Sequence, residues 1–228
     1  MCSADSDFNE YQNVQKYLWG QNRFEARQAD GENFTIIDLT RVALPRLNPH
    51  NSEILLVRDE YGLAHDIITK RAEVMRAAFL VTGQPGIGGL RCPPQGHELI
   101  AHTGKTMFLI YLLARLLCNR QTVALQISAR HYVLFTEQGA TIHEGDKPGG
   151  IPKDVWALSD TLGMAETHPC SAFLFSQHAH LVHTSSPAAR NSKDWVKQIS
   201  ATEHIMDLWS EKEVERLLYV MVLCSVLH

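Results

Sequence analysis

Cysteine is scarce in this sequence, and its distribution does not suit disulfide bonding. The five cysteines are odd in number and irregularly spaced, and no Cys-x-x-Cys pair occurs. These features argue against a disulfide-stabilised secreted scaffold and favour a reducing intracellular compartment, cytoplasmic or nuclear. The first seven residues are polar and acidic, so the sequence also lacks the basic and apolar regions of a secretory signal.

Positive charge and long apolar runs are lacking as well. Lysine and arginine total 21 against 25 aspartate and glutamate, which gives a formal net charge of -4 at pH 7. A protein whose main partner is a nucleic acid is usually basic, so no nucleic-acid partner is expected. The longest apolar run, residues 217–227, is about half of the ~20 residues that a membrane-spanning helix needs. We therefore expect a buried helix there and no membrane anchor.

Hydrophobic residues are plentiful, at 45% of 228, and can build one sizeable core. Apolar runs typical of strands alternate with helical patterns, which predicts the α/β class with a mainly parallel sheet. Residues 1–50 are expected to form a partly ordered leader, with 1–33 loosely attached around one short helix, and residues 51–228 to form the domain. The expected strands are 34–37, 54–57, 77–81, 122–127, 132–135, 139–143, 155–158, 172–175, 181–183 and 204–208, with 132–135 and 139–143 paired as a hairpin. The expected helices are 62–75, 106–118, 192–199 and one that Ser210 caps, with Glu213 at capping-box spacing.

A phosphate-binding motif is present in two pieces. The P-loop pattern is G-x-x-x-x-G-K-[ST], placed between a buried strand and a helix. Its first piece is Gly83, Gln84, Pro85, Gly86, Ile87 and Gly88, and its second is Gly104, Lys105 and Thr106, with fifteen residues (89–103) between them. In such a motif the glycine loop cradles phosphate oxygens, the lysine reaches the β- and γ-phosphates, and the hydroxyl binds Mg²⁺. The flanking elements make a chance coincidence the less favoured interpretation.

The insert makes nucleotide binding doubtful on physical grounds. Lengthening the loop costs only on the order of 1 kcal/mol in closure entropy, but fixing each added residue costs roughly 1–2 kcal/mol. An insert that stays mobile beside Gly88 would spoil the phosphate cradle, so weakened or absent binding is expected. One hypothesis is that residues 89–104 are a translated intron, since their removal restores the motif in frame; a mature transcript that keeps those codons would contradict it.

Other residues are candidates for supporting roles. Asp160 ends the strand-like run 155–158 and could hold Mg²⁺, or it could simply begin a turn. Thr161 stands where many ATPases have a catalytic glutamate, so fast hydrolysis is not expected. The hydroxyl residues at 184–186 could sense a γ-phosphate, although turn formation explains them as well. A zinc site is not expected from His178, His180 and His183, because the third would face away from the first two on a strand.

Several segments, taken in order, resemble a family of fungal P-loop proteins related to the NTPase modules of Crinkler and retrotransposon-hot-spot-type proteins. They are ILLVRDEYGLAHDII, AAFLVTGQPGIG with GKTMFLIYLLARLL, YVLFTEQGATIH, VWALSD, HLVHTSSPAARNSKDWVKQ and WSEKEV, and they span roughly residues 50–216. The resemblance implies a P-loop NTPase three-layer sandwich, AAA+/STAND-like, with strand order 5-1-4-3-2 plus the inserted hairpin. It also implies nucleotide binding. Two departures are the split P-loop and a chain that ends soon after the fifth strand, without the helical lid expected of such proteins.

The sequence therefore predicts a module that binds ATP or GTP, with ATP preferred, and that acts as a slow NTPase or switch. Lys105 would neutralise phosphate charge, Thr106 and Asp160 would hold Mg²⁺, with Asp160 the catalytic candidate, and residues 83–88 would cradle the phosphates. The alternative is a degenerate interaction module that keeps the sheet and binds an unknown protein partner but no nucleotide. A small-molecule kinase would share the P-loop, but no acceptor pocket is evident from the sequence.

Overall fold

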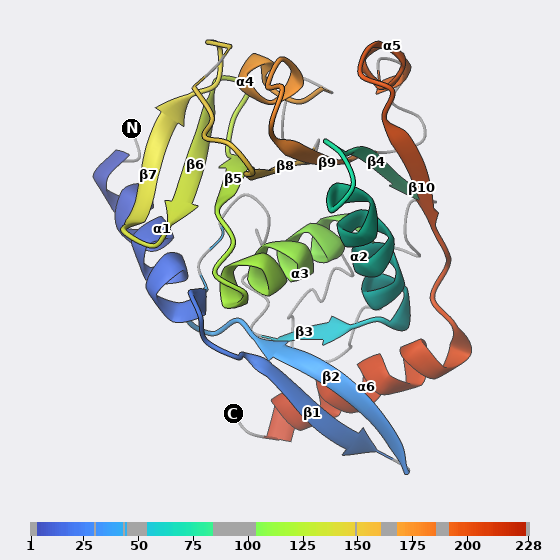
Figure 1. The fold of residues 1–228 in the computed structure, drawn as a ribbon. Coiled ribbons are helices and arrows are strands. Elements are labelled where there is room, and N and C mark those ends of the chain that lie inside the picture. The colour runs from blue at the N-terminus through green and yellow to red at the C-terminus, as the bar shows by residue number, and fades with distance from the viewer. Residues whose placement is uncertain are drawn as a thin grey trace.

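The computed structural model describes residues 4–29, 31–42, 44, 54–83, 104–148, 150–160, 168–185 and 192–226. Figure 1 shows the arrangement of the elements. The helices are α1 (Ala4–Leu18), α2 (Asp59–Ala72), α3 (Gly104–Cys118), α4 (Ser171–Leu174), α5 (Ser192–Gln198) and α6 (Glu211–Val226). The strands are β1 (Phe24–Ala29), β2 (Glu32–Asp38), β3 (Ile54–Val57), β4 (Ala78–Gly83), β5 (Val123–Gln126), β6 (His131–Thr136), β7 (Gly139–Glu144), β8 (Trp156–Asp160), β9 (His180–Thr184) and β10 (Thr202–Met206).

A seven-stranded sheet organises the molecule. Its strand order is β10-β4-β9-β8-β5-β6-β7, and the first five strands are mutually parallel. Counted along the chain, these five parallel strands lie in the order 5-1-4-3-2. β6 and β7 extend the sheet beyond β5 with antiparallel pairing, in which Tyr132 lies opposite His143. Helices cover both faces, so the predicted α/β class with a mainly parallel sheet is confirmed (Figure 1).

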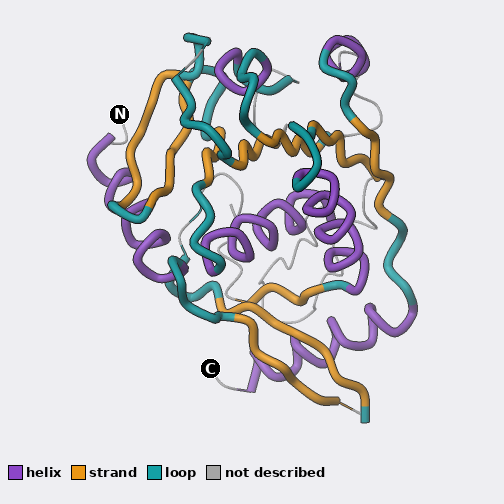
Figure 2. The backbone as a smooth tube through the Cα atoms, viewed as in Figure 1, coloured by secondary structure: helices purple, strands orange, loops and turns teal. Residues whose placement is uncertain are grey.

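Helix α3 is apolar on nearly every side because it lies between two sheets. One side faces the large sheet, and the other faces a second, three-stranded antiparallel sheet of order β1-β2-β3 (Figures 1 and 2). Its buried side chains share one core with Ile37 and Leu55 of the small sheet and with Phe79 and Leu158 of the large one. A helix surrounded in this way has little solvent-facing surface to fill with polar residues, which explains the sequence of 104–118.

Helix α1 is more firmly attached than the sequence suggested. It runs for fifteen residues, and Tyr11, Val14 and Leu18 are buried in the same core as α3. The Gln12 side-chain amide bonds the backbone of Ala140 on the edge strand β7 in both directions, donating from Nε2 at 2.6 Å and accepting at Oε1 at 3.4 Å. The expectation of a loosely attached segment over 1–33 was therefore wrong for this helix. The apolar positions i, i+3 and i+7 were the signal for a packed face.

Two further local predictions differ from the structure. Residues 171–174 form the short helix α4, closed by the bond from the Leu174 N–H to the Cys170 carbonyl, where a strand was expected at 172–175. Four apolar residues in a row do not distinguish a buried strand from a buried helical turn. The polar strand β1 was not anticipated because it is stabilised by its pairing with β2 and shows no apolar alternation of its own.

The C-terminal helix α6 lies along the small sheet on the side away from α3 (Figure 1). Leu217 and Val220 pack with Ile36 and Leu56 there. The predicted capping box is confirmed, because the Glu213 N–H donates to Ser210 Oγ at 3.2 Å and the Ser210 N–H donates back to Glu213 Oε2 at 2.9 Å. Within the described part of the chain, no helix has both the length and the apolar character to cross a membrane.

Candidate functional site

The candidate site lies at the carboxyl edge of the parallel strands. β4 ends at Gly83, β8 at Asp160 and β10 at Met206, and helix α3 begins beside them at Gly104. Gly83 lies opposite Met206 in the parallel register. In open α/β sheets, ligands bind outside the carboxyl ends of the strands, and a helix N-terminus adds unpaired N–H groups and partial positive charge.

Lys105 places a positively charged side chain at the carboxyl edge of the parallel strands. It lies in the first turn of α3 and is only 6% exposed. Its Nζ donates a hydrogen bond of 3.0 Å to the carbonyl oxygen of Gly83, so the amine lies at the end of strand β4. Burial lowers the pKa of the Lys105 amine, and the negative charge of Asp160 acts in the opposite direction. The structure thus brings three predicted residues from three elements together.

Gly83 and Gly104 are both placed where a side chain would be in unusually tight contact with its surroundings. A Cβ on Gly83 would lie 3.1 Å from the carbonyl oxygen of Met206. A Cβ on Gly104 would lie 3.1 Å from Nη1 of Arg58. Gly104 directly precedes Lys105 as the first residue of α3, so it stands where the motif requires its last glycine. The residue pair Gly-Lys is therefore intact in the fold, and the added length falls before it.

Thr106 and Asp160 supply oxygen donors of the kind that Mg²⁺ prefers. Both are buried, and the pleat of β8 puts Asp160 on the α3 face of the sheet, because Leu158 two residues earlier packs in the core with that helix. In the described residues there is no cluster of three or more His, Cys, Asp or Glu side chains that could hold a metal alone. This donor set fits Mg²⁺, which usually takes one or two protein ligands and completes its shell with water and phosphate oxygens.

Arg58 belongs to the candidate site, although the sequence analysis did not identify it. It precedes α2, is 3% exposed, and forms a two-pronged ion pair with Glu213, with Nε–Oε1 3.1 Å and Nη2–Oε2 3.2 Å. Its Nη2 also donates to the carbonyls of Asp207 and Leu208, at 3.1 and 3.0 Å. The guanidinium lies 4.8 Å from the ring centre of Trp209. A charged residue directly after the apolar strand 54–57 was a possible signal, but its partner lies 155 positions away.

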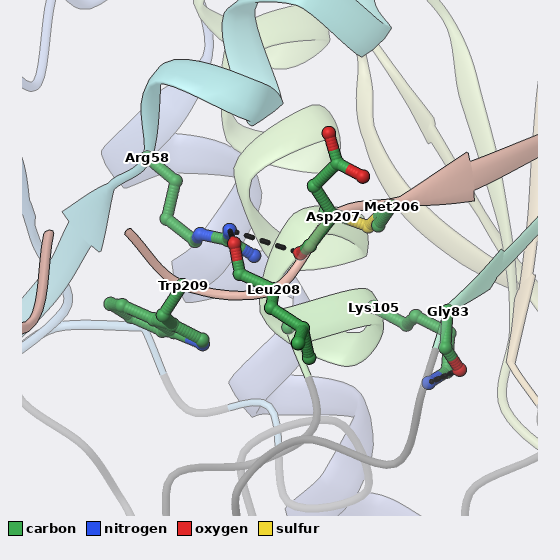
Figure 3. A pocket seen from close by; sticks show the side chains of 8 residues that line it. Arg58, Gly83, Lys105, Met206, Asp207, Leu208 and Trp209 are labelled. Atoms are coloured by element: carbon green, nitrogen blue, oxygen red, sulfur yellow. Dashed lines mark hydrogen bonds between the residues drawn. The ribbon is translucent and has the colours of Figure 1, made fainter. Parts of the chain in front are cut away.

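These residues line a small open hollow, drawn in Figure 3. Its walls are Arg58, Gly83, Gly104, Lys105, Met206, Asp207, Leu208 and Trp209. Lys105 and Gly83 lie at one end and Arg58 at the other, with the segment after β10 between them (Figure 3). The Asp207 carboxylate points away from Lys105 and Gly83 (Figure 3). Tyr61 supports the start of α3 next to this hollow, because its hydroxyl donates a 2.9 Å bond to the Gly104 carbonyl.

A buried polar row crosses the opposite face of the same edge. Ser159 Oγ donates to Gln126 Oε1 at 2.8 Å and lies 3.0 Å from His183 Nδ1. The Gln126 oxygen also accepts from the Cys170 N–H at 3.0 Å. This row ties β5, β8 and β9 together directly beneath Asp160. His183 is fully buried within it, which suits a structural role.

Several predicted site residues lie outside the described residues. They are Gln84, Pro85, Gly86, Ile87 and Gly88 of the first motif piece, the insert 89–103, Thr161, and Ser186 of the predicted hydroxyl residues. Of the predicted hydroxyl residues, Thr184 Oγ1 donates a long 3.5 Å bond to the Ser159 carbonyl, and the Ser185 N–H donates to the Val81 carbonyl at 3.1 Å. The described part of the site is therefore Gly83, Gly104, Lys105, Thr106 and Asp160.

Comparison of the chain with models of protein families, with curated proteins and with solved structures finds no match. The functional argument consequently depends on the geometry of the site.

Proposed function

We propose that this chain binds a nucleoside triphosphate, ATP in the first instance, together with Mg²⁺ at the N-terminus of α3. The observation that carries the proposal is the placement of Lys105. A buried lysine in the first turn of a helix, held at the end of the adjoining parallel strand and next to a carboxylate, matches the needs of a bound polyphosphate. The five parallel strands in the order 5-1-4-3-2 are consistent with the AAA+/STAND-like core that the resemblance implies.

Each described residue has a defined role in this proposal. The Lys105 ammonium neutralises phosphate charge, and the first N–H groups of α3 donate to phosphate oxygens. Thr106 and Asp160 hold Mg²⁺, which would shield the charge between the phosphates. Gly83 and Gly104 keep the backbone of strand and helix free of side chains at the point where the ligand enters. Binding is the proposed activity, and hydrolysis is expected to be slow.

The test is calorimetric titration of the full chain with ATP·Mg²⁺ and GTP·Mg²⁺. We expect Lys105→Ala to weaken binding by at least about tenfold, since a hydrogen bond to a charged group contributes roughly 1.5–3 kcal/mol. Lys153→Ala, which changes an exposed lysine outside the site, is the matched control. Chelation of Mg²⁺ should also weaken binding of the triphosphate.

A deletion variant separates the two candidate functions. Removal of residues 88–103 joins Ile87 to Gly104 and gives the uninterrupted motif GQPGIGKT. If the deletion variant binds ATP and the full chain does not, the degenerate interaction module is the correct description of this chain. If both fold and neither binds ATP or GTP, or if Lys105→Ala binds as well as the wild type, the proposal is wrong.

A further inference from the structure

Arg58 has one terminal nitrogen, Nη1, that makes no hydrogen bond to the described residues. Nε and Nη2 together make four hydrogen bonds, to Glu213, Asp207 and Leu208. Nη1 makes none with the described part of the chain, although Arg58 is only 3% exposed. An arginine carries five N–H donors in a rigid fork, and Nη1 is not among the fully enclosed side-chain atoms without a partner in the described residues, so its donors stay open to the hollow.

That nitrogen points toward the start of helix α3. It lies 3.1 Å from where a Cβ on Gly104 would be, and both residues line the hollow that contains Lys105. The start of α3 lies beside the same hollow, because Gly104 and Lys105 both line it. A helix N-terminus, the buried ammonium of Lys105 and the guanidinium of Arg58 therefore line one hollow, with the two cations at its opposite ends (Figure 3), which is the chemistry of a polyanion site.

We propose that Arg58 is a second cationic contact for the phosphates, with Nη1 donating to a phosphate oxygen while Nε and Nη2 keep their bonds to Glu213 and the two carbonyls. The inference depends on the proposed function, because it assigns a ligand contact to that same site. The surrounding bonds hold the guanidinium in place before the ligand arrives, so little side-chain entropy is lost on binding.

The same contact couples the ligand to helix α6. Glu213, which holds Arg58, also closes the capping box at the start of that helix. Arg58 further holds the backbone of the segment between β10 and α6 through two carbonyls. A phosphate on Nη1 consequently stabilises this segment, and by linkage any change that loosens it weakens phosphate binding.

The test compares ligands that differ in phosphate content. For Arg58→Lys we expect ATP·Mg²⁺ affinity to fall about 10- to 100-fold, from the loss of a charge-assisted bond, with the effect smaller for ADP and less than twofold for adenosine. Arg216→Lys is the matched control, because Arg216 pairs with Glu32 and Asp59 at α6 without lining the hollow. It should leave ATP affinity within twofold of wild type.

A second measurement uses the unaltered chain and applies even if Arg58→Lys fails to fold. Hydrogen exchange of the backbone amides at 207–214 should slow at least threefold with saturating ATP·Mg²⁺ and should not change with adenosine. Two outcomes would overturn the role of Arg58 and leave the proposed function standing. In the first, the wild type binds ATP but the exchange rate at 207–214 does not change. In the second, Arg58→Lys loses as much affinity for adenosine as for ATP. If neither the full chain nor the 88–103 deletion variant binds ATP, both the proposed function and the role of Arg58 are wrong.

Discussion

The buried ion pair between Arg58 and Glu213 should dominate the stability of the region around α6. Its side chains are only 2% and 6% exposed, so water screens the pair weakly. Removing one partner leaves the other charge buried, which costs about 3–5 kcal/mol. Glu213→Leu also removes the carboxylate that accepts the hydrogen bond from the Ser210 N–H, which costs about 1 kcal/mol of stability more. The free energy of unfolding of a typical protein is about 5–15 kcal/mol, so breaking this ion pair would remove a large fraction of it.

A double-mutant cycle measures the pair itself. We expect Arg58→Met and Glu213→Leu each to lower the free energy of unfolding by the amounts above. The double variant should lose less than the sum of the two by at least about 2 kcal/mol, since it leaves no unpaired charge. Urea unfolding followed by circular dichroism and by tryptophan fluorescence, to which Trp209 beside Arg58 contributes, gives the four values.

The pH dependence provides an independent measurement with a definite sign. Although burial acts to raise it, hydrogen bonds from Arg58 and Ser210 keep the pKa of Glu213 below its ordinary value of 4.5. A lowered carboxyl pKa stabilises the fold above the unfolded pKa, and this stabilisation is lost as the pH falls through the folded pKa. The stability difference between wild type and Glu213→Gln should therefore be constant from pH 7 to 5 and shrink below about 4.5. Glu215→Gln, at an exposed position on the same helix, is the control.

Two results would refute this reasoning: a coupling energy below about 0.5 kcal/mol, the level of independent sites, or equal effects of Glu213→Gln and Glu215→Gln.

Three further predictions follow from local geometry. Tyr61→Phe removes the 2.9 Å donor to the Gly104 carbonyl in a buried setting and should lower the free energy of unfolding by about 1–3 kcal/mol, measured in urea; no change would mean that another donor takes its place. Gly83→Ala puts a methyl group 3.1 Å from the Met206 carbonyl oxygen and should cost about 1–3 kcal/mol, seen as a lower Tm; an unchanged Tm would show that β10 can yield. Burial raises the pKa of the Cys170 thiol to about 11, so a thiol reagent at pH 8 should modify it only after unfolding, and rapid reaction in the folded protein would contradict its burial.

The sequence predicted those elements whose residues are apolar because the element is buried. The apolar runs at 54–57, 78–81, 123–125 and 156–158 coincide with strands, because a strand covered on both faces has no polar positions. Helix α3 was predicted for the corresponding reason. The strand β1 was missed because pairing with a neighbour, and not its own sequence, makes it a strand.

The candidate site divides in the same way. Lys105, Thr106 and Asp160 could be named in advance because the two pieces of a split motif and a strand end carry their signal. Arg58 could not, since its role arises from contacts with residues about 150 positions later in the chain. Its partner Glu213 was identified only as a helix cap. Long-range polar contacts leave no periodic pattern in a sequence, so they become visible only in the folded chain.

The side-chain amide of Gln12 affects whether the edge of the large sheet at β7 can pair with a strand of another molecule. By imitating a peptide group against Ala140, it occupies hydrogen-bonding positions that the outermost strand β7 would otherwise offer to another chain. The sheet can thus be lengthened by a neighbour at β10 more readily than at β7. A shortened form that begins after residue 20 would leave the Ala140 N–H and carbonyl without these bonds and would give the sheet a second edge open to pairing.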